Sequence, residues 1–285
     1  MARRQQDKVR TLRAVNPNPG IRAAYRRALR SMVRAMREDY ERRLTELYSV
    51  LEPRITGDAK WRSPLERLQE AMEKLENKWA GKFASFATKT AASFVKGVFG
   101  RVVKGRKSSL KDAGINIPLK NKDFKGQLAD ERVQILIEAN VALIKTIPAK
   151  LHGDVQQMIT DALVNGWTHE KLVEKLVKTF DVSERRAKVI ARDQTLKATQ
   201  SLAQAVDKEL GITEGVWIHV PGKKSSRPTH VEMQGKTFTL ATGLWDSDVS
   251  RWVKPGELIC CYCKYRPVVP ESLAGSKKYG QAVYE

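Results

Sequence analysis

Apolar residues recur every three or four positions along much of this chain, which is the spacing of an amphipathic helix. The first such run extends from residue 21 to about residue 51, and its apolar members fall on one helical face: Tyr25, Leu29, Met32, Met36, Tyr40, Leu44, Leu47 and Leu51. Pro53 interrupts the pattern, and Pro64 suits the first turn of a following helix. The pattern therefore predicts one long helix before Pro53 and another that opens at Pro64.

A second basic amphipathic stretch lies within residues 77–111, which hold nine basic residues and no acidic ones. Its apolar stripe is largely aromatic and consists of Trp79, Phe83, Phe86, Phe94 and Val98. Aromatic rings beside lysines can stack on nucleic-acid bases or lie on a membrane surface. A stripe at helical spacing is more often buried in a core, and we expect a core position here.

Further helical patterns follow between residues 130 and 211. The first is helical up to Pro148 and continues helically beyond it. Thr168 is a suitable N-cap for the next helix. Asp181 and Glu184 have the three-residue spacing of a capping box, which predicts that another helix begins there.

The pattern changes after residue 211, where two short segments alternate as strands do. These are "GVWIHV", residues 215–220, and "GKTFTL", residues 235–240. The tail from Pro255 to Glu285 is rich in loop-forming residues. The predicted fold class is α+β, with a mainly α-helical N-terminal part of long amphipathic helices and a C-terminal domain of helices and a small β-sheet.

Charge divides the chain unevenly. Residues 1–125 hold 30 Lys and Arg against 13 Asp and Glu, whereas residues 126–285 hold 22 against 19. A net charge of +20 favours a polyanionic partner such as nucleic acid, because neutralised phosphates release condensed counterions. The residues expected to contact DNA are Arg22, Arg26, Arg27, Arg30, Arg34, Arg37, Lys82, Lys89, Lys96, Arg101, Lys104, Arg106 and Lys107.

Composition also sets the expected segments and compartment. Residues 1–20 are predicted to be a flexible basic arm, residues 21–104 a basic helical region, and residues 105–125 a linker rich in Gly, Ser, Lys and Asn. Residues 126–285 then form one compact domain. No run of eighteen apolar residues occurs, and three clustered cysteines do not make a secreted disulfide framework, so a soluble protein made in a reducing cytoplasm is expected.

The three cysteines fall within four residues of "ELICCYCKYRP". Zinc takes thiolate and imidazole ligands, so Cys261 and Cys263, with Cys260 as an alternate, and the upstream His230 and His219 are candidates for a structural zinc. The spacing matches no common zinc finger, and the other interpretation is small buried thiols with His230 hydrogen-bonded in a loop.

Catalytic interpretations have little support in the sequence. No flanking signature supports a nucleophilic pair of Cys263 and His230, and no Walker A loop or dinucleotide fingerprint is present. Asp246 and Asp248 are interpreted as solvated loop carboxylates rather than as metal ligands of a nuclease. No catalytic residue is therefore predicted.

Polar residues also crowd one helical segment, "RRAKVIARDQTLKATQ". On a helix Ile190, Ala191, Gln194 and Ala198 share a face, which places Gln194 against the edge of the core and turns Arg192 away. An ordinary amphipathic helix with one buried amide accounts for this pattern.

Taken in order, several motifs resemble those of the phage Mu F-like head morphogenesis family, the minor head proteins of tailed bacteriophages. They are "ALVNGWTHEKLVEKLVKTF", "RRAKVIARDQTLKATQ", the tryptophan strand "GVWIHV", "SRPTHVEMQGKTF" and a C-x-C before "RP". The resemblance covers about residues 126–268 and identifies 126–285 as a Mu F-like domain. It places the family's helix motif on Ala191, Arg192, Asp193 and Thr195, its Arg-x-x-His on Arg227 and His230 followed by Gly235, and its C-x-C on Cys261 and Cys263.

The resemblance implies a non-enzymatic minor capsid protein that associates with the portal inside the head and assists assembly, DNA packaging or ejection. Its implied partners are the portal protein and packaged double-stranded DNA, bound without sequence preference, with the major capsid or a scaffolding protein as further candidates and no membrane during assembly. Its implied location is the virion, near the portal vertex. The apolar stripe of residues 25–51 would then pack on a portal or sister subunit. The alternatives are a zinc-containing nucleic-acid-binding module and a metal-dependent nuclease or toxin-like domain.

Overall fold

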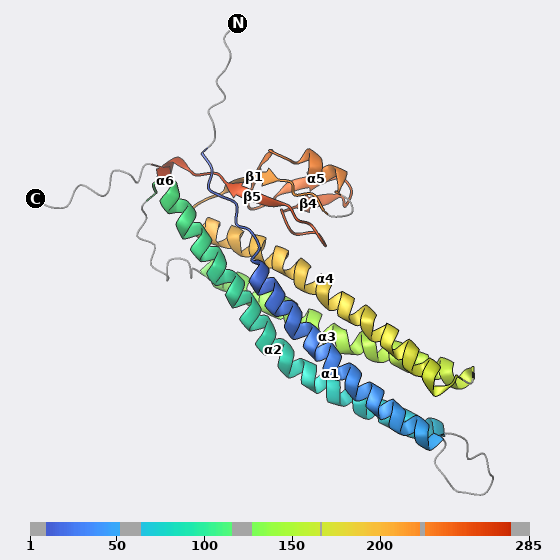
Figure 1. Ribbon diagram of the computed structural model, residues 1–285. Helices are drawn as coiled ribbons and strands as arrows, with labels where there is room; N and C mark the ends of the chain where they lie inside the picture. The colour runs from blue at the N-terminus through green and yellow to red at the C-terminus, as the bar shows by residue number, and fades with distance from the viewer. Residues whose placement is uncertain (1–9, 52–63, 116–126, 166, 223–225, 275–285) are drawn as a thin grey trace, which may run out of the picture. The chain divides into compact units, whose positions relative to one another are not determined.

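Four long helices make up most of the computed structural model, which describes residues 10–51, 64–115, 127–165, 167–222 and 226–274. They are α1 Pro19–Leu51, α2 Pro64–Asp112, α3 Gln127–Val164 and α4 His169–Glu209 (Figure 1). Short strands and turns follow α4, so the α+β prediction is confirmed. Within the described part of the chain, no helix combines the length and the apolarity that crossing a lipid bilayer would require.

Two helices contain an interruption signal that does not end them. α3 continues through Pro148, as the sequence predicts, and Ile147 and Leu151 near the proline are both buried. Their burial holds the helix together where the proline removes one backbone hydrogen bond. α4 is continuous where a new helix was expected, and the carboxylate of Glu184 accepts hydrogen bonds from Arg30 and Arg34 rather than capping a helix.

The expected arm and linker also differ from the structure. Residues 10–18 are extended but held in place: the amide of Leu12 donates to the carbonyl of Pro267 at 2.9 Å, and the Leu12 side chain is buried. Residues 105–112 are the last turns of α2. The rest of the predicted arm, 1–9, and of the predicted linker, 116–125, lies outside the described residues.

The chain divides into two compact units, and the division does not fall near residue 125. Unit 1 comprises the described residues of 1–22, 94–136 and 192–285, and unit 2 those of 23–93 and 137–191. Each long helix contributes residues to both units. The boundary predicted from composition and charge, near residue 125, therefore does not coincide with the division between the two units.

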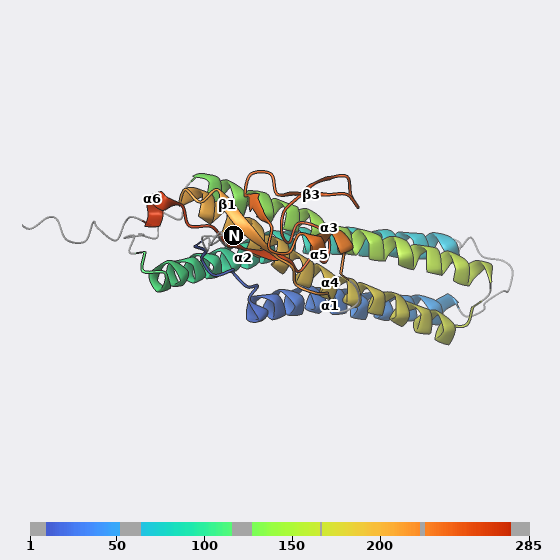
Figure 2. The same cartoon turned by 90° about the horizontal axis from the view of Figure 1, so that it is seen from above.

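Unit 2 is a packing of four helical segments, drawn side by side in Figures 1 and 2. α1 and α4 contact each other at two points along their length. Arg30, early in α1, pairs with Glu184, whereas the later Thr45 lies 3.2 Å from His169, the first residue of α4. α1 also reaches α3, where the hydroxyl of Tyr40 lies 3.0 Å from Nδ1 of His152. The segments of α1 and α4 are therefore antiparallel and share a core with α3.

The apolar stripe of α1 is buried within unit 2. Tyr25, Leu29, Met36, Tyr40 and Leu44 are all buried, as is Val33 in place of the expected Met32. The stripe therefore packs against its own chain, and the expectation that it packs on a portal or sister subunit was wrong. The aromatic stripe of α2 is a core stripe as expected, with Trp79, Phe83, Phe94 and Val98 buried and Phe86 half-buried.

Unit 1 contains a small antiparallel sheet in the order β2-β1-β5. Its strands are β1 Glu214–Ile218, β2 Thr237–Thr239 and β5 Lys264–Pro267; a separate hairpin pairs β3 Leu244–Asp246 with β4 Arg251–Val253, and two short helices, α5 Pro228–Glu232 and α6 Glu271–Ala274, complete the unit. The strands predicted at 215–220 and 235–240 are present. β3, β4 and β5 were not predicted, because three or four residues are too few to show an alternating pattern.

A buried ion pair joins three elements of unit 1. Arg106 on α2 and Asp207 on α4 are both fully buried, with Nε of the arginine 2.6 Å from Oδ1 of the aspartate. The hydroxyl of Tyr265 on β5 donates to Asp207 at 2.5 Å, and Arg106 donates to the carbonyl of Arg13 at 2.9 Å. Burial raises the pKa of the Tyr265 hydroxyl well above its usual value, so the hydroxyl stays protonated and keeps donating.

Breaking this pair from one side should destabilise the protein strongly. Arg106→Met leaves a buried, unpaired carboxylate, and we expect the free energy of unfolding to fall by about 3–5 kcal/mol in urea denaturation. Replacing the group as a whole, with Arg106→Met, Asp207→Leu and Tyr265→Phe together, should recover most of the loss. The exposed Lys104→Met, two residues away on the same helix, should change stability by less than about 0.5 kcal/mol. Equal stability of Arg106→Met and the wild type would contradict the assigned role.

Candidate metal centre

Two histidines and two cysteines meet at one end of the small sheet in unit 1. β1 and β5 are antiparallel, with Trp217 opposite Tyr265 and Ile218 opposite Lys264. The next step of this register brings His219 beside Cys263. His230 comes from α5, a helical turn whose first residue is Pro228, which is a favourable position for proline.

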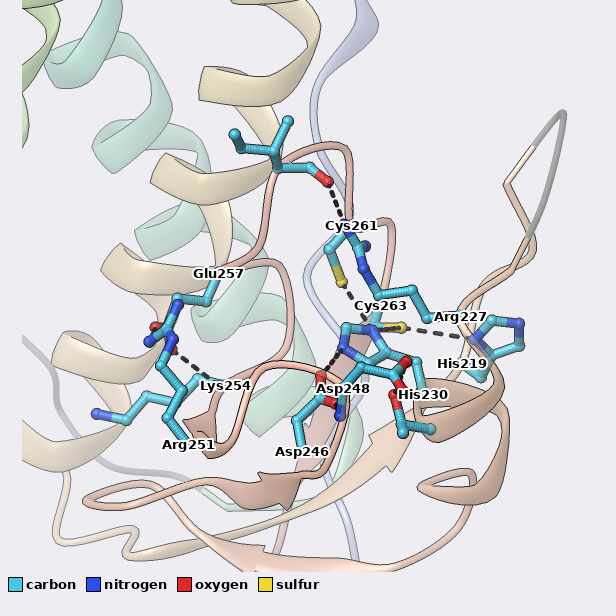
Figure 3. Close-up of polar contacts among 12 residues, drawn as sticks. His219, Arg227, His230, Asp246, Asp248, Arg251, Lys254, Glu257, Cys261 and Cys263 are labelled. Atoms are coloured by element: carbon cyan, nitrogen blue, oxygen red, sulfur yellow. Dashed lines mark hydrogen bonds and ion pairs between the residues drawn. The ribbon is translucent and has the colours of Figure 1, made fainter.

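The sulfur and nitrogen atoms of these residues face one another (Figure 3). Nδ1 of His230 lies 3.4 Å from Sγ of Cys261 and 3.6 Å from Sγ of Cys263, and Sγ of Cys263 lies 3.6 Å from Nδ1 of His219. His230, Cys261 and Cys263 are each at most 3% exposed, whereas His219 is half-buried. The candidate ligands named from the sequence are therefore close together and largely shielded from water.

A buried carboxylate holds the far side of the His230 ring. Oδ2 of Asp246 lies 3.1 Å from Nε2 of His230, and the side chain of Asp246 is 0% exposed. The other oxygen accepts the backbone amide of Asp248 at 3.0 Å. The interpretation of Asp246 as a solvated loop carboxylate was wrong; Asp248, by contrast, is exposed.

Electrostatics in the cluster favour one thiolate. A hydrogen bond from Cys263 and the neighbouring His230 lower the pKa of Cys261 to about 4, against burial, which acts to raise it. The same hydrogen bond, together with burial, raises the pKa of Cys263. Burial alone would lower the pKa of His230, but Cys261 and Asp246 raise it overall. The negative charge is therefore held on Cys261, with the proton retained on Cys263.

The loop that carries the cysteines is fastened by residues from two other elements. On α4, Asp193 accepts the backbone amide of Cys260 at 2.7 Å, and Arg192 donates to Sγ of Cys260 at 3.0 Å. From the other side, Arg227 donates to the carbonyl of Ile259 at 3.0 Å. The structure thus brings together three groups of motif residues that are far apart in the sequence.

Cys260 and the α4 segment differ in detail from expectation. Cys260 has a left-handed φ of 56°, and its sulfur contacts Arg192 rather than the histidines, so it lies outside the cluster. Arg192 is half-buried against this loop instead of turned away from the fold. Gln194 is half-buried, and the buried polar residues of the segment are Asp193, Thr195, Thr199 and Gln200.

Asp246 and Asp193 are residues of this contact network whose positions the sequence did not reveal. Each is an acidic side chain whose partner lies on another element, His230 for Asp246 and the amide of Cys260 for Asp193. The pattern of neighbouring residues in the sequence does not indicate a partner that lies on another element. The one available signal was that Asp193 belongs to the resembling motif of α4.

The cluster has the residue types of a Cys–His–Asp catalytic relay, but its surroundings do not suit catalysis. A nucleophilic sulfur must reach a substrate. Cys261, Cys263 and His230 are all nearly inaccessible, and the edge of the fully buried Trp217 ring packs against the imidazole of His230 at 5.4 Å between centroids. The arrangement suits a group that holds the local fold together.

The cationic residues expected to contact DNA fall into different environments. Arg22, Arg27, Lys82, Lys89, Lys96, Arg101 and Lys104 are exposed, and Arg26 and Lys107 are half-buried. Arg30 and Arg34 pair with Glu184, and Arg37 pairs with Glu41. Arg106 is buried in the ion pair with Asp207 and cannot contact DNA in this fold, so it is removed from the predicted set.

Comparison with known proteins finds one similar family and one similar protein. Residues 153–266 match the family model described as phage Mu protein F like protein. A protein of Haemophilus influenzae, described as uncharacterized, is 27% identical over 275 residues, which cover 93% of this chain. The chain spans 57% of that relative's length. No solved structure matches the chain.

The matched segment contains most of the site. It includes α4 with Asp193, the strand β1 with Trp217, His230 on α5, and both Cys261 and Cys263. The resemblance inferred from the motifs is confirmed over this segment. Residues 153–266 are therefore similar to the phage Mu protein F like family.

Proposed function

We propose that this protein is a minor head protein of a tailed phage, which associates with the portal inside the head and contacts packaged DNA. The observation that carries the proposal is the family match over residues 153–266. A role in head assembly requires surfaces for other head components and for DNA, and the described residues offer a candidate for each.

The candidate DNA surface in unit 1 is one side of α2. Lys96, Lys104 and Lys111 are exposed there, and their spacing places them within the same side of the helix. Point cations along a helix suit phosphate contact, which positions a protein on DNA without reading its sequence. Dense DNA inside a phage head would offer such phosphates.

The candidate protein surface is the β3–β4 hairpin. Trp245 and Trp252 are opposite each other in the register, with ring centroids 6.0 Å apart, and both are more than half exposed. Gly243, with φ of 90°, shapes the start of the hairpin, because a Cβ there would lie 2.0 Å from the carbonyl oxygen of Val253. Exposed aromatic pairs are typical of protein interfaces, and we assign this one to the portal protein.

The location can be tested in phage particles. Particles assembled with the wild-type protein should contain it, and cryo-electron microscopy should place its density at the portal vertex. A Trp245→Ser, Trp252→Ser variant should fold but be incorporated at a small fraction of the wild-type level, because the proposed contact is lost. Lys74→Gln, an exposed change away from the hairpin, is the matched control. Absence of the wild-type protein from both proheads and virions would refute the proposal.

DNA binding should depend steeply on salt. For the full chain, log Kd is plotted against log salt concentration. The slope of this plot should be smaller by about 2 in the Lys96→Gln, Lys104→Gln variant than in the wild type, because each lost phosphate contact contributes about 0.9. The Lys74→Gln, Lys178→Gln variant removes the same charge from lysines already paired with Glu70 and Glu174, and should keep the wild-type slope. Identical slopes for both variants would exclude this surface.

The same DNA samples test the competing enzyme hypothesis. Supercoiled plasmid incubated with the protein and a divalent metal ion should remain intact, because the cluster of His230, Cys261 and Cys263 is buried. Nicking that disappears in a His230→Ala variant would favour a metal-dependent nuclease instead.

A further inference from the structure

The distances in the cluster are those between ligands of a tetrahedral zinc ion. With zinc–sulfur bonds of about 2.3 Å and zinc–nitrogen bonds of about 2.0 Å, a sulfur and a nitrogen in one tetrahedral shell lie about 3.6 Å apart. The three sulfur–nitrogen distances in the cluster are 3.4, 3.6 and 3.6 Å. The three buried ligand atoms of His230, Cys261 and Cys263 lie within 4.8 Å of one another.

The neutral form of His230 offers only one acceptor to the two sulfurs that face it. If Nε2 of His230 donates its proton to Asp246, Nδ1 has a single lone pair, yet two sulfurs face it. One lone pair accepts from one thiol. A cation between the three atoms would use both sulfurs as thiolates and the same lone pair as a ligand.

The hydrogen bonds on the far side of the two imidazole rings resemble those of metal-bound histidines. Such histidines usually donate their other ring nitrogen to a carboxylate or another acceptor, which fixes the tautomer. Asp246 provides this acceptor for His230, and the hydroxyl of Ser226 lies 3.1 Å from Nε2 of His219. In both histidines Nδ1 is therefore the nitrogen that faces the sulfurs.

From this geometry we propose that the chain binds one structural zinc ion through His230, Cys261 and Cys263, that His219 is the fourth ligand, and that Asp246 orients His230 from outside the shell. Two thiolates and two imidazoles suit zinc and do not suit magnesium or calcium, which take oxygen ligands. Four protein ligands close the shell, as structural zinc requires.

The ion would join parts of unit 1 that contain little regular structure of their own. The sheet strands are three to five residues long, and α5 has five residues. Elements this short are marginal by themselves and need packing or a staple. The ligands come from the end of β1, from α5 and from the loop before β5, so one ion ties all three together.

Metal content of the purified full chain is the first test. Protein produced in medium supplemented with zinc should contain about one equivalent by mass spectrometry, and Cys261→Ser and Cys263→Ser should each retain less than about a tenth of that. Cys260→Ser is the matched control, since it removes the neighbouring thiol that faces Arg192, and it should keep the full equivalent. Circular dichroism would show whether each variant retains its helices.

Cobalt substitution of the metal-free wild type tests the ligand set without the need for variants. Cobalt(II) in a tetrahedral site with two thiolates gives intense visible and sulfur charge-transfer bands. His219→Ala should reduce the intensity of the visible bands as the shell opens to water. Asp246→Asn should keep the bands but weaken zinc affinity by about 10- to 100-fold in a chelator competition.

Several results would overturn the proposal. They are less than half an equivalent of zinc in the wild type, absence of thiolate bands with cobalt, or a disulfide between Cys261 and Cys263 in place of free thiols. Unchanged zinc content in His219→Ala, with unchanged cobalt bands, would refute the fourth ligand. The zinc proposal does not rest on the proposed function, because metal binding and location in the phage head are measured separately.

Discussion

The buried pair of Arg106 and Asp207 is the constraint on which unit 1 depends. Removing two charges from water is costly, and the cost is offset only while both partners and their hydrogen bonds stay in place. The last turns of α2, the end of α4 and strand β5 are distant in the sequence. Arg106, Asp207 and Tyr265 connect these three elements through one group of buried contacts. The other features of unit 1 are arranged around it.

The position of the thiol cluster follows from these contacts. Tyr265 hydrogen-bonds to Asp207, which sets the inward face of β5. The register of β5 against β1 continues one step beyond Lys264 and brings Cys263 beside His219. Cys261 lies in the preceding turn and is buried, as Cys263 and Tyr265 are. Cys260, with its left-handed φ, lies outside the cluster.

Sequence patterns predicted what local spacing determines and missed what depends on a distant partner. The apolar stripes of residues 25–51 and 79–98 predicted buried helix faces, and α1 and α2 carry them. Arg106 was grouped with the exposed cations because nothing near it in sequence marks it; its carboxylate partner is 101 residues away. Asp246 was missed for the same reason, since the ring that it orients lies on α5.

The motifs of the family are individually weak because none of them is a site by itself. Arg192 and Asp193 on α4 fasten the loop that carries Cys261 and Cys263, and Arg227 fastens it from the other side. His230 follows Arg227 by three residues, one helical turn, so the arginine can hold the loop while the histidine faces its sulfurs. Each motif supplies some of the contacts in a single network of hydrogen bonds. The motifs are therefore informative together where each motif alone is not, because their residues contact one another in the fold.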